Sequence, residues 1–257
     1  MINQIKKVAT KAIKNAGKIA LGEYKNFDRA TIKLKAHQEI LTKVDLMSEK
    51  VIIDEVKKNF PEHSILSEEA GDDNIKSEYL WIIDPIDGTT NFSMHNPLWC
   101  VSVGIAYRGE IVLGFIYAPC QNELYTAQKG QGAYLNGKKI KVSNIFEGKI
   151  LNAFCSAREI KHTKKAVRYF SYQKLRGGSC YMLGSAALEL GYVAAGRLES
   201  MVIPGAHPWD VAAGVLLVRE AGGIVSDFKG GEWTLRSENM LASNGKVHRE
   251  VLKVINK

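Results

Sequence analysis

The chain has 257 residues, of which 46% are hydrophobic and 24% are charged, and its formal net charge is +8. This composition is typical of a folded globular protein and argues against a disordered chain. No apolar run reaches the roughly 18 residues that a membrane helix needs, and the lysine-rich N-terminus lacks the apolar block of a secretory signal.

The positive charge would suit either nucleic acid or an anionic phosphorylated substrate. The lysines are scattered and form no block with interleaved aromatic residues. This pattern favours a solvated lysine-rich surface and argues against a nucleic-acid site. The four cysteines are at least 20 residues apart, so no CxxC pair is present. A zinc site is therefore not expected, and a reduced, cytoplasmic setting is.

The first half of the chain predicts two helices followed by a run of strands. Apolar residues recur at helical spacing near the N-terminus, at 5, 8, 12, 13 and 16, and again over 43–59, where the helix should end near Pro61. Short β-like stretches separated by Gly- and Asn-rich turns indicate an antiparallel meander. These strands are expected at 64–66, 79–83, 99–106, 111–118, 123–127 and 132–135.

The second half predicts alternating strands and helices. Strands are expected at 150–155, 173–176, 199–203 and 224–226. Helices are expected at 162–171, at 184–195, from near Pro208 to about Ala221, and from about Val247. Interleaved helices with many antiparallel strands indicate a layered α+β sandwich. The stretch 137–148 is the expected boundary between an N-terminal lobe, 1–145, and a C-terminal lobe, 146–257, that together form one catalytic unit.

Two carboxylates, Asp84 and Asp87, follow the buried strand 79–83 and are joined by a Pro-containing turn. Without a counter-ion they would repel each other and lose hydration, so packing alone does not account for them. A hard divalent cation such as Mg²⁺ relieves this cost, because it takes oxygen ligands from carboxylates, water and phosphate. Gly88 and Thr89 then start a helical turn whose free amides can hold a phosphate.

Two further acidic sites fit the same scheme. Glu68 and Glu69 follow another predicted strand, and Asp210 stands at the start of a helix after Pro208-Trp209. Taken alone, Asp210 is better explained as a helix cap. Together with Asp84 and Asp87 it becomes a candidate metal ligand.

These motifs closely resemble those of the inositol monophosphatase family. Two signatures carry the resemblance, WIIDPIDGTTNF at 81–92 and PWDVAAGVLLVREAGG at 208–223. The Glu pair at 68–69, the helix opening at 184–186 and the Thr42…Asp45 pair also fit. The resemblance covers nearly the whole chain and implies an αβαβα sandwich of the inositol monophosphatase and sugar phosphatase type.

The resemblance also implies a role for each matched residue. Glu68, Asp84 and the carbonyl of Ile86 match the ligands of a first metal, and Asp84, Asp87 and Asp210 match those of a second. Glu68 also lies close to a third, weaker metal. The catalytic set is Glu68 with Thr89 and Asp45, the last two orienting the attacking water. The phosphate and substrate set is Gly88, Thr89, Gly184, Ser185 and Ala186, whereas Glu69 is expected to be structural.

The implied reaction is hydrolysis of a phosphate monoester by metal-activated water, with two to three Mg²⁺ ions and no protein nucleophile. Unaided cleavage is so slow that the site must lower the barrier by on the order of 20 kcal/mol. Inhibition by Li⁺ is implied as well, because Li⁺ can occupy a Mg²⁺ position. The expected partner is a small phosphorylated substrate, and the expected assembly is a homodimer that binds neither membrane nor nucleic acid.

One position departs from the family pattern. Members that act on inositol phosphates commonly carry a Glu seven residues before the Asp of the WD motif, and here that residue is Ile203. Isoleucine cannot bond a substrate hydroxyl, so the usual inositol contact is missing. Glu199 and His207 are the candidates to substitute for this Glu, although neither stands at the matched position. Inositol phosphate, fructose 1,6-bisphosphate, 3′-phosphoadenosine 5′-phosphate or another nucleotide, and histidinol phosphate therefore all stay open.

Several other residues have two readings. Lys35, Arg158 and Arg176 could meet the substrate phosphate, although each also fits a solvated surface charge. Leu188, Leu190 and Val193 on the helix 184–195 belong either to the core or to a dimer interface. A non-catalytic, partner-binding regulatory protein is the alternative for the whole chain. The complete set of acidic residues favours catalysis.

Overall fold

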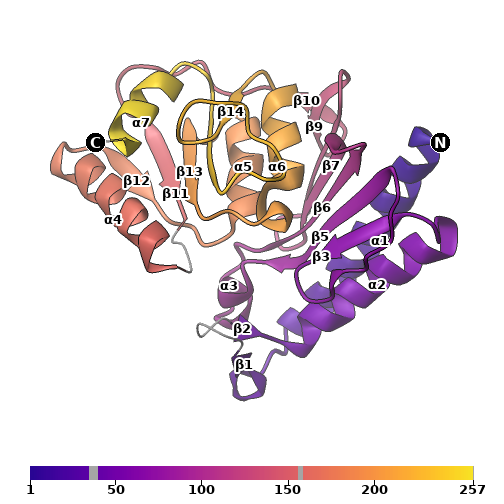
Figure 1. The fold of residues 1–257 in the computed structure, drawn as a ribbon. Coiled ribbons are helices and arrows are strands. Elements are labelled where there is room, and N and C mark those ends of the chain that lie inside the picture. Colours follow the sequence, from indigo (N-terminus) through magenta and orange to yellow (C-terminus); the bar gives the residue numbers. More distant parts are fainter. Residues whose placement is uncertain (35–39, 156–158, 257) are drawn as a thin grey trace.

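The structure, a computed structural model, describes residues 1–34, 40–155 and 159–256. Helices and two large sheets alternate in layers, as Figure 1 shows. Within the described residues the α-helices are α1 (Ile2–Tyr24), α2 (Lys43–Asn59), α3 (Thr89–Ser93), α4 (Ile160–Leu175), α5 (Ala186–Ala194), α6 (Pro208–Glu220) and α7 (His248–Ile255). A short 3-10 helix (Arg29–Thr31) precedes the two-stranded pair of β1 (Lys33–Leu34) and β2 (Ile40–Leu41).

The larger sheet has eight strands in the order β10-β9-β8-β7-β6-β5-β3-β4. Its neighbours pair antiparallel except β3 and β5, which are parallel. The strands are β3 (Ser64–Ser67), β4 (Gly71–Asp72), β5 (Tyr79–Asp87), β6 (Cys100–Tyr107), β7 (Glu110–Ala118), β8 (Glu123–Gln128), β9 (Gly132–Leu135) and β10 (Lys138–Ile140).

The smaller sheet has five strands in the order β12-β11-β13-β15-β14. β11 pairs parallel with both β12 and β13, whereas β15 runs antiparallel to β13 and β14. The strands are β11 (Leu151–Phe154), β12 (Ser179–Tyr181), β13 (Ser200–Pro204), β14 (Ile224–Ser226) and β15 (Asn239–Ser243).

The layers run α, β, α, β, α, which confirms the predicted sandwich. α1 and α2 pack on one face of the larger sheet, and α5 and α6 fill the space between the two sheets (Figure 1). α4 and α7 cover the outer face of the smaller sheet. The largest apolar cluster surrounds α5 and α6 and includes Leu188, Leu190 and Val193. These three side chains therefore belong to the core.

Local sequence explains the helices that position the site. The five apolar positions predicted for α1, Ile5, Val8, Ala12, Ile13 and Ala16, are all buried against the larger sheet. This is the burial expected of an amphipathic helix. The other predicted helices also form, and α6 begins with proline at its first position and ends at Glu220, just before the predicted stop at Gly222-Gly223.

The helix α6 lies unusually close to the larger sheet because glycine faces it. A Cβ atom added at Gly114 of β7 would lie 2.7 Å from the carbonyl oxygen of Ala213. Any side chain at this position would push α6 away from the sheet. The close fit sets the distance between α6 and the larger sheet. It therefore also positions Asp210, in the first turn of α6.

The predicted strand at 173–176 is wrong. α4 continues to Leu175, and the strand instead forms at β12 after the turn Gly177-Gly178. Intrahelical hydrogen bonding carries the helix through these residues until the glycines end it. The strands β1, β2, β4, β10 and β15 were not predicted. The strand β15 has no alternating pattern because Met240, Leu241 and Ala242 are all buried.

The segment between β10 and β11 is where the chain passes from the larger sheet to the smaller one. We propose that it divides the chain into lobes 1–145 and 146–257. None of the described helices has the length and apolar content required to traverse a bilayer.

Candidate active site

The N-terminus of α2 carries one half of the predicted water-orienting pair. Thr42 caps the helix, and its backbone N–H and hydroxyl both donate to Asp45 Oδ2, at 2.8 and 2.6 Å. The other oxygen of Asp45 lies 3.2 Å from the hydroxyl of Thr89, at the start of α3. The capping box therefore holds one Asp45 oxygen and aims the other at Thr89. The structure brings the predicted pair together.

The end of β5 carries two predicted metal ligands on an irregular stretch of strand. The register with β6 shifts between Asp84 and Asp87, which is the signature of a β-bulge. Asp84 is buried, and its Oδ1 accepts a hydrogen bond of 3.0 Å from the Ile86 amide. The hydroxyl of Ser48 on α2 donates to the carbonyl of Pro85 at 2.8 Å. The turn between Asp84 and Asp87 is thus stabilised by its own hydrogen bond and by the one from α2.

Gly88 has to be glycine for two independent reasons. Its φ of +93° lies in the left-handed region, which side chains rarely adopt. A Cβ atom there would also come within 3.1 Å of the Gly184 carbonyl oxygen and of Ser185 Cβ. The predicted phosphate-binding turn at 88–89 therefore lies directly against the predicted substrate segment 184–186.

Asp87 faces the N-terminus of α5. Its carboxylate accepts hydrogen bonds from the Ser185 hydroxyl, from the Ala186 amide at 3.1 Å and from the Ala187 amide at 2.7 Å. The partial positive charge of a helix N-terminus favours an anion at this position. The Cys100 thiol also donates to Asp87, at 3.6 Å, so donors from β6 and from α5 meet at this one carboxylate.

The turn after β3 places Glu68 at the same end of the larger sheet. β3 and β5 are parallel, with Ser67 opposite Ile83, and the Glu68 amide donates to the Ile83 carbonyl at 3.1 Å. The buried carboxylate of Glu49 on α2 anchors this turn. It accepts from the Ser67 hydroxyl and from the amides of Glu69 and Ala70, the last two at 3.1 Å.

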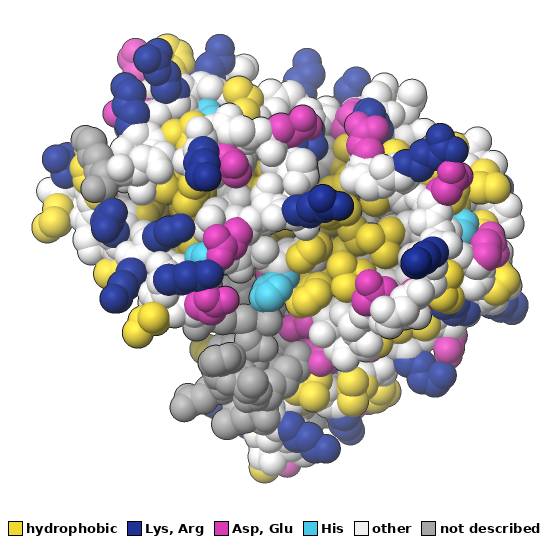
Figure 2. All heavy atoms as spheres, in the orientation of Figure 1, with side chains coloured by type: hydrophobic (Ala, Val, Ile, Leu, Met, Phe, Trp, Pro, Cys, Tyr) yellow, Lys and Arg dark blue, Asp and Glu magenta, His cyan; other side chains and the backbone are white. Residues whose placement is uncertain are grey.

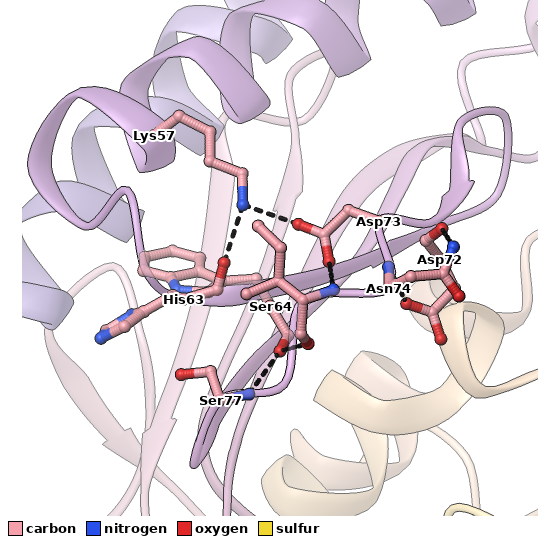
Figure 3. Close-up of polar contacts among 9 residues, drawn as sticks. Lys57, His63, Ser64, Asp72, Asp73, Asn74 and Ser77 are labelled. Atoms are coloured by element: carbon pink, nitrogen blue, oxygen red, sulfur yellow. Dashed lines mark hydrogen bonds and ion pairs between the residues drawn. The ribbon is translucent and has the colours of Figure 1, made fainter.

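A second set of contacts closes the acidic segment from its far end, as Figure 3 shows. Lys57 on α2 donates to the Asp73 carboxylate at 2.6 Å and to the His63 carbonyl at 2.8 Å. Asp73 in turn accepts from the Ile75 amide, and the Ser64 hydroxyl accepts from the Ser77 amide. The loop that carries Glu68 is therefore anchored to α2 at both ends.

Asp210 enters the site from the first turn of α6. One of its oxygens accepts a hydrogen bond of 3.0 Å from the His207 amide, so the capping alternative describes a contact that is present. Asp210 also lines a cavity of about 500 Å³ together with Asp87. Gly184, Ala186, Ile203 and His207 are among the other lining residues. The cavity thus brings Asp87 at the end of β5 and Asp210 on α6 next to the predicted substrate segment.

Burial and mutual repulsion raise the pKa values of the acidic residues. Burial is the main cause for Asp45, whose pKa rises to about 6 although hydrogen bonds from Thr42 oppose the shift. The pKa of Asp87 also rises to about 6 through burial, against the hydrogen bonds from Ser185 and α5. Burial raises the pKa of Asp84 well above its usual range, and nearby carboxylates add to the shift. These carboxylates are Glu68, Asp87, Asp210 and Asp45.

The chemistry of this cluster fits a hard divalent cation. The charges that raise the pKa of Asp84 are all carboxylates, and a bound cation would remove that repulsion. Among the described residues, however, no three His, Cys, Asp or Glu side chains stand in a formed metal-binding group. Asp84, Asp87 and Asp210 each accept a hydrogen bond from a main-chain amide.

The remaining predicted contacts separate into three outcomes. Arg176 lines a different cavity, so it does not meet the substrate phosphate at this site. Lys35 and Arg158 lie outside the described residues. Glu199 is buried and accepts from the Ser143 hydroxyl and the Leu151 amide, which ties it to the smaller sheet. Of the two suggested substitutes for the missing Glu, only His207 lines the cavity.

Sequence reasoning missed the role of α2 beyond Asp45. Ser48 and Glu49 are buried, and both contact turns that carry predicted site residues. A signal was available, because Asp45, Ser48 and Glu49 share one helical face with buried apolar residues such as Ile52. Polar residues on a buried helical face require partners. The cavity residues Cys155 and Met182 carried no comparable signal.

Comparison with known proteins gives consistent matches along the chain. A family model described as "Inositol monophosphatase family" matches residues 1–257. "Nus factor SuhB" of Escherichia coli K12 is 39% identical over 251 residues, covering 95% of this chain and 93% of that protein. A "Fructose-1,6-bisphosphatase/inositol-1-monophosphatase" of Thermotoga maritima is 39% identical over 224 residues, covering 87% and 85%. The structure of an inositol monophosphatase from Anabaena superposes with a TM-score of 0.87 at 34% identity, covering 99% and 96%.

Proposed function

Because this chain belongs to the inositol monophosphatase family, we propose that it is a Mg²⁺-dependent hydrolase of small phosphate monoesters. The observation that carries the proposal is the Thr89–Asp45 pair. The Thr89 hydroxyl lies 3.2 Å from Asp45 Oδ1, beside the buried acids at the end of β5. A hydroxyl and a carboxylate at this distance can position a water and receive its proton.

The proposed metal ligands are the acidic residues whose charges act on one another. Glu68, Asp84 and the Ile86 carbonyl would hold the first Mg²⁺. Asp84, Asp87 and Asp210 would hold the second, and Glu68 would lie near a third. Bound there, Mg²⁺ would supply positive charge that offsets the carboxylates, lowers the pKa of water and withdraws charge from the phosphoryl oxygens. Li⁺ would inhibit by competing for one of these positions.

The protein's own residues would orient the water and move its proton. Thr89 Oγ1 would accept the proton of the attacking water while passing its own proton to Asp45 Oδ1. Burial raises the pKa of Asp45 to about 6, so its carboxylate accepts a proton more readily than an ordinary aspartate does. Thr42 would keep Asp45 in place through its two hydrogen bonds. Glu68 would complete the catalytic set.

The phosphate and the alcohol would occupy the cavity beside α5. We assign the phosphate to the turn Gly88-Thr89 and the rest of the substrate to Gly184, Ser185 and Ala186. The close approach of Gly88 to Gly184 and Ser185 supports a single continuous site. A cavity of about 500 Å³ is large enough for a small phosphorylated molecule.

The proposed substrates are inositol phosphate and related sugar phosphates such as fructose 1,6-bisphosphate. The double name of the Thermotoga maritima relative supports both. A test would measure phosphate release with Mg²⁺ and with EDTA from these two, from histidinol phosphate and from 3′-phosphoadenosine 5′-phosphate. Release that requires Mg²⁺ and favours one ester would support the proposal. Release that is equal with EDTA would refute the metal requirement, and no release from any ester would refute the activity.

A regulatory role is the second candidate, and the "Nus factor" name of the Escherichia coli relative favours it. Such a role would need a partner protein in addition to the substrate. Pull-down from cells of variants that have lost phosphatase activity would test it, since partner binding should survive the loss. We also propose that the protein works in the cytoplasm, which its free cysteines support.

The proposed assembly is a homodimer, and exposed apolar side chains on and after α4 would supply its interface. Ile160 and Leu175 are 75% and 85% exposed, and Val167, Phe170, Tyr181 and Met182 are also exposed. Sedimentation of the wild type should give a dimer and that of Leu175→Glu a weakened one. A wild-type monomer at high protein concentration would refute this assembly.

A further inference from the structure

A second cavity, of about 600 Å³, lies between the C-terminal end of α4, the starts of β11 and β12, and α7. Ile150 and Ser179, which line it, stand at the starts of β11 and β12. The active-site cavity instead touches Cys155 and Met182, which follow the same two parallel strands. The two cavities therefore lie at opposite ends of β11 and β12 and have no lining residue in common.

Three cations line this second cavity, which we call the α4–α7 cavity. They are Lys149, Arg176 and Lys246. In the part of the chain that the structure describes, none of them forms an ion pair with a carboxylate. The one acidic lining residue, Glu250, lies 3.3 Å from Lys253 and is partly neutralised by it. The cavity thus presents a net positive charge to any ligand.

The α4–α7 cavity also has apolar lining residues. Its floor contains the buried side chains of Val247, Val251 and Val254, and the exposed ring of Phe146 stands at its edge. Arg176 stacks over the ring of Tyr172, with its guanidinium carbon 3.9 Å from the ring centroid. A guanidinium whose carbon lies over a ring can still present N–H groups to phosphate oxygens.

We propose that the α4–α7 cavity binds a small organic polyanion with a flat apolar or aromatic part, the chemistry of a nucleoside polyphosphate. Lys149, Arg176 and Lys246 would bind the phosphates, and the valine floor with Phe146 would bind the base. The volume lies in the range of small-ligand sites. Charge alone would not select this place, because Lys and Arg side chains are spread widely over the surface around α4 and α7, as Figure 2 shows. The floor of buried valines, Val247, Val251 and Val254, distinguishes this cavity from the rest of that surface.

The test uses the full chain and ATP carrying a fluorescent label on its ribose, with EDTA present. EDTA removes metal ions, so the active site neither hydrolyses the probe nor binds it through a metal. We expect fluorescence anisotropy to saturate with a Kd on the order of 100 µM. The double variant Arg176→Glu/Lys246→Glu should weaken binding by roughly tenfold or more. Lys149→Glu/Lys246→Glu, which leaves the Arg176–Tyr172 stack intact, should weaken it similarly.

The matched control reverses two charges elsewhere. Lys138 and Lys139 are exposed on β10 and line neither cavity. The Lys138→Glu/Lys139→Glu variant changes the net charge equally and should bind the probe as the wild type does. Equal weakening in this control, or no saturation at millimolar probe, would overturn the proposal.

Photolabelling locates the bound nucleotide independently of any variant. With 8-azido-ATP, peptides containing 146–150, 172–179 or 246–254 should carry the label. Label confined to 84–96 or 182–210 would place the nucleotide in the active-site cavity and refute the second site. This outcome leaves the proposed phosphatase activity untouched, since the two sites have no lining residue in common.

Discussion

Ser185 donates a hydrogen bond from its hydroxyl to the carboxylate of Asp87, although the two residues are 98 positions apart in the chain. The bond joins the end of β5 to the start of α5. With the amides of Ala186 and Ala187 it gives a buried carboxylate three donors. Asp87 is therefore both a proposed metal ligand and the contact that sets α5 against the larger sheet.

Asp87→Asn should abolish Mg²⁺-dependent phosphate release, lowering kcat/KM by about 10³-fold or more. The amide carries no charge for Mg²⁺, and its NH₂ group would face the donors of α5. The matched control is Asp54→Asn, because Asp54 is exposed on α2 and forms an ion pair with Lys50. That variant should keep wild-type kinetics. If Asp87→Asn kept most of its kcat at ordinary Mg²⁺ concentrations, the site assignment would be wrong.

Glu49→Ala should both destabilise the protein and raise the Mg²⁺ concentration needed for half-maximal activity. Three donors around a buried carboxylate would lose their acceptor, at a cost of about 2–4 kcal/mol in the free energy of unfolding. The turn that carries Glu68 would loosen as well. Urea denaturation and a Mg²⁺ titration measure the two effects.

The control for Glu49 is Glu55→Ala on the same helix, where the lost contacts are an ion pair with Lys11 and a hydrogen bond of 3.1 Å from the Asn59 side chain. It should change stability by no more than about 1 kcal/mol and leave the Mg²⁺ requirement unaltered. Glu49→Gln keeps an acceptor oxygen and should recover part of the loss. An unchanged Mg²⁺ requirement in Glu49→Ala would mean that Glu49 acts on stability alone.

Ile203→Gln should raise the activity on inositol 1-phosphate relative to p-nitrophenyl phosphate, which has no ring hydroxyls. Ile203 lines the cavity together with Asp210, and glutamine there can bond a hydroxyl. We expect the ratio of the two kcat/KM values to rise by roughly tenfold. Ile203→Met, which conserves volume and adds no hydrogen-bonding group of comparable strength, should leave the ratio near that of the wild type. A ratio that moves equally in both variants would show that hydroxyl recognition lies elsewhere.

His248 should lower stability as the pH drops below about 6.5, the value at which histidine in an unfolded chain titrates, whereas the raised pKa values of Asp45, Asp84 and Asp87 act in the opposite direction. Burial lowers the pKa of His248, which lies between the hydroxyls of Ser226 and Ser243. Below pH 6.5 the unfolded chain therefore binds more protons at His248 than the folded one, until the pH passes the lowered pKa. His248→Gln should reduce this dependence. Urea midpoints at several pH values test it, and parallel curves for variant and wild type would contradict it.

The local parts of the site were predictable from the sequence. Asp84 and Asp87 lie at the end of one strand within one short motif, and Thr42 and Asp45 form a capping pair three residues apart. Such relations depend on neighbours in the chain. The contact of Asp87 with Ser185 depends instead on how α5 packs between two sheets, and the place of Arg176 depends on where α4 ends. No spacing rule in the sequence predicts the Asp87–Ser185 contact or the position of Arg176.

The missed strand β15 has a related explanation. β15 pairs with β13 and β14, and all three of its central residues are buried, so the period of two that marks a half-exposed strand is lost. Helices such as α1 were easier to predict. One face of α1 packs against a sheet, so its buried apolar residues recur at helical spacing.

The central layer of α5 and α6 depends on both halves of the chain. Its residues come from the C-terminal half, but the sheet face that it covers is built by the N-terminal half. A truncated product ending near residue 145 would expose Ile82, Ile116 and Tyr125 to water and leave Asp87 without its three donors. The gene therefore cannot be divided between β10 and β11 into two pieces that fold independently. For the same reason its first half cannot serve as a folded unit in a fusion protein.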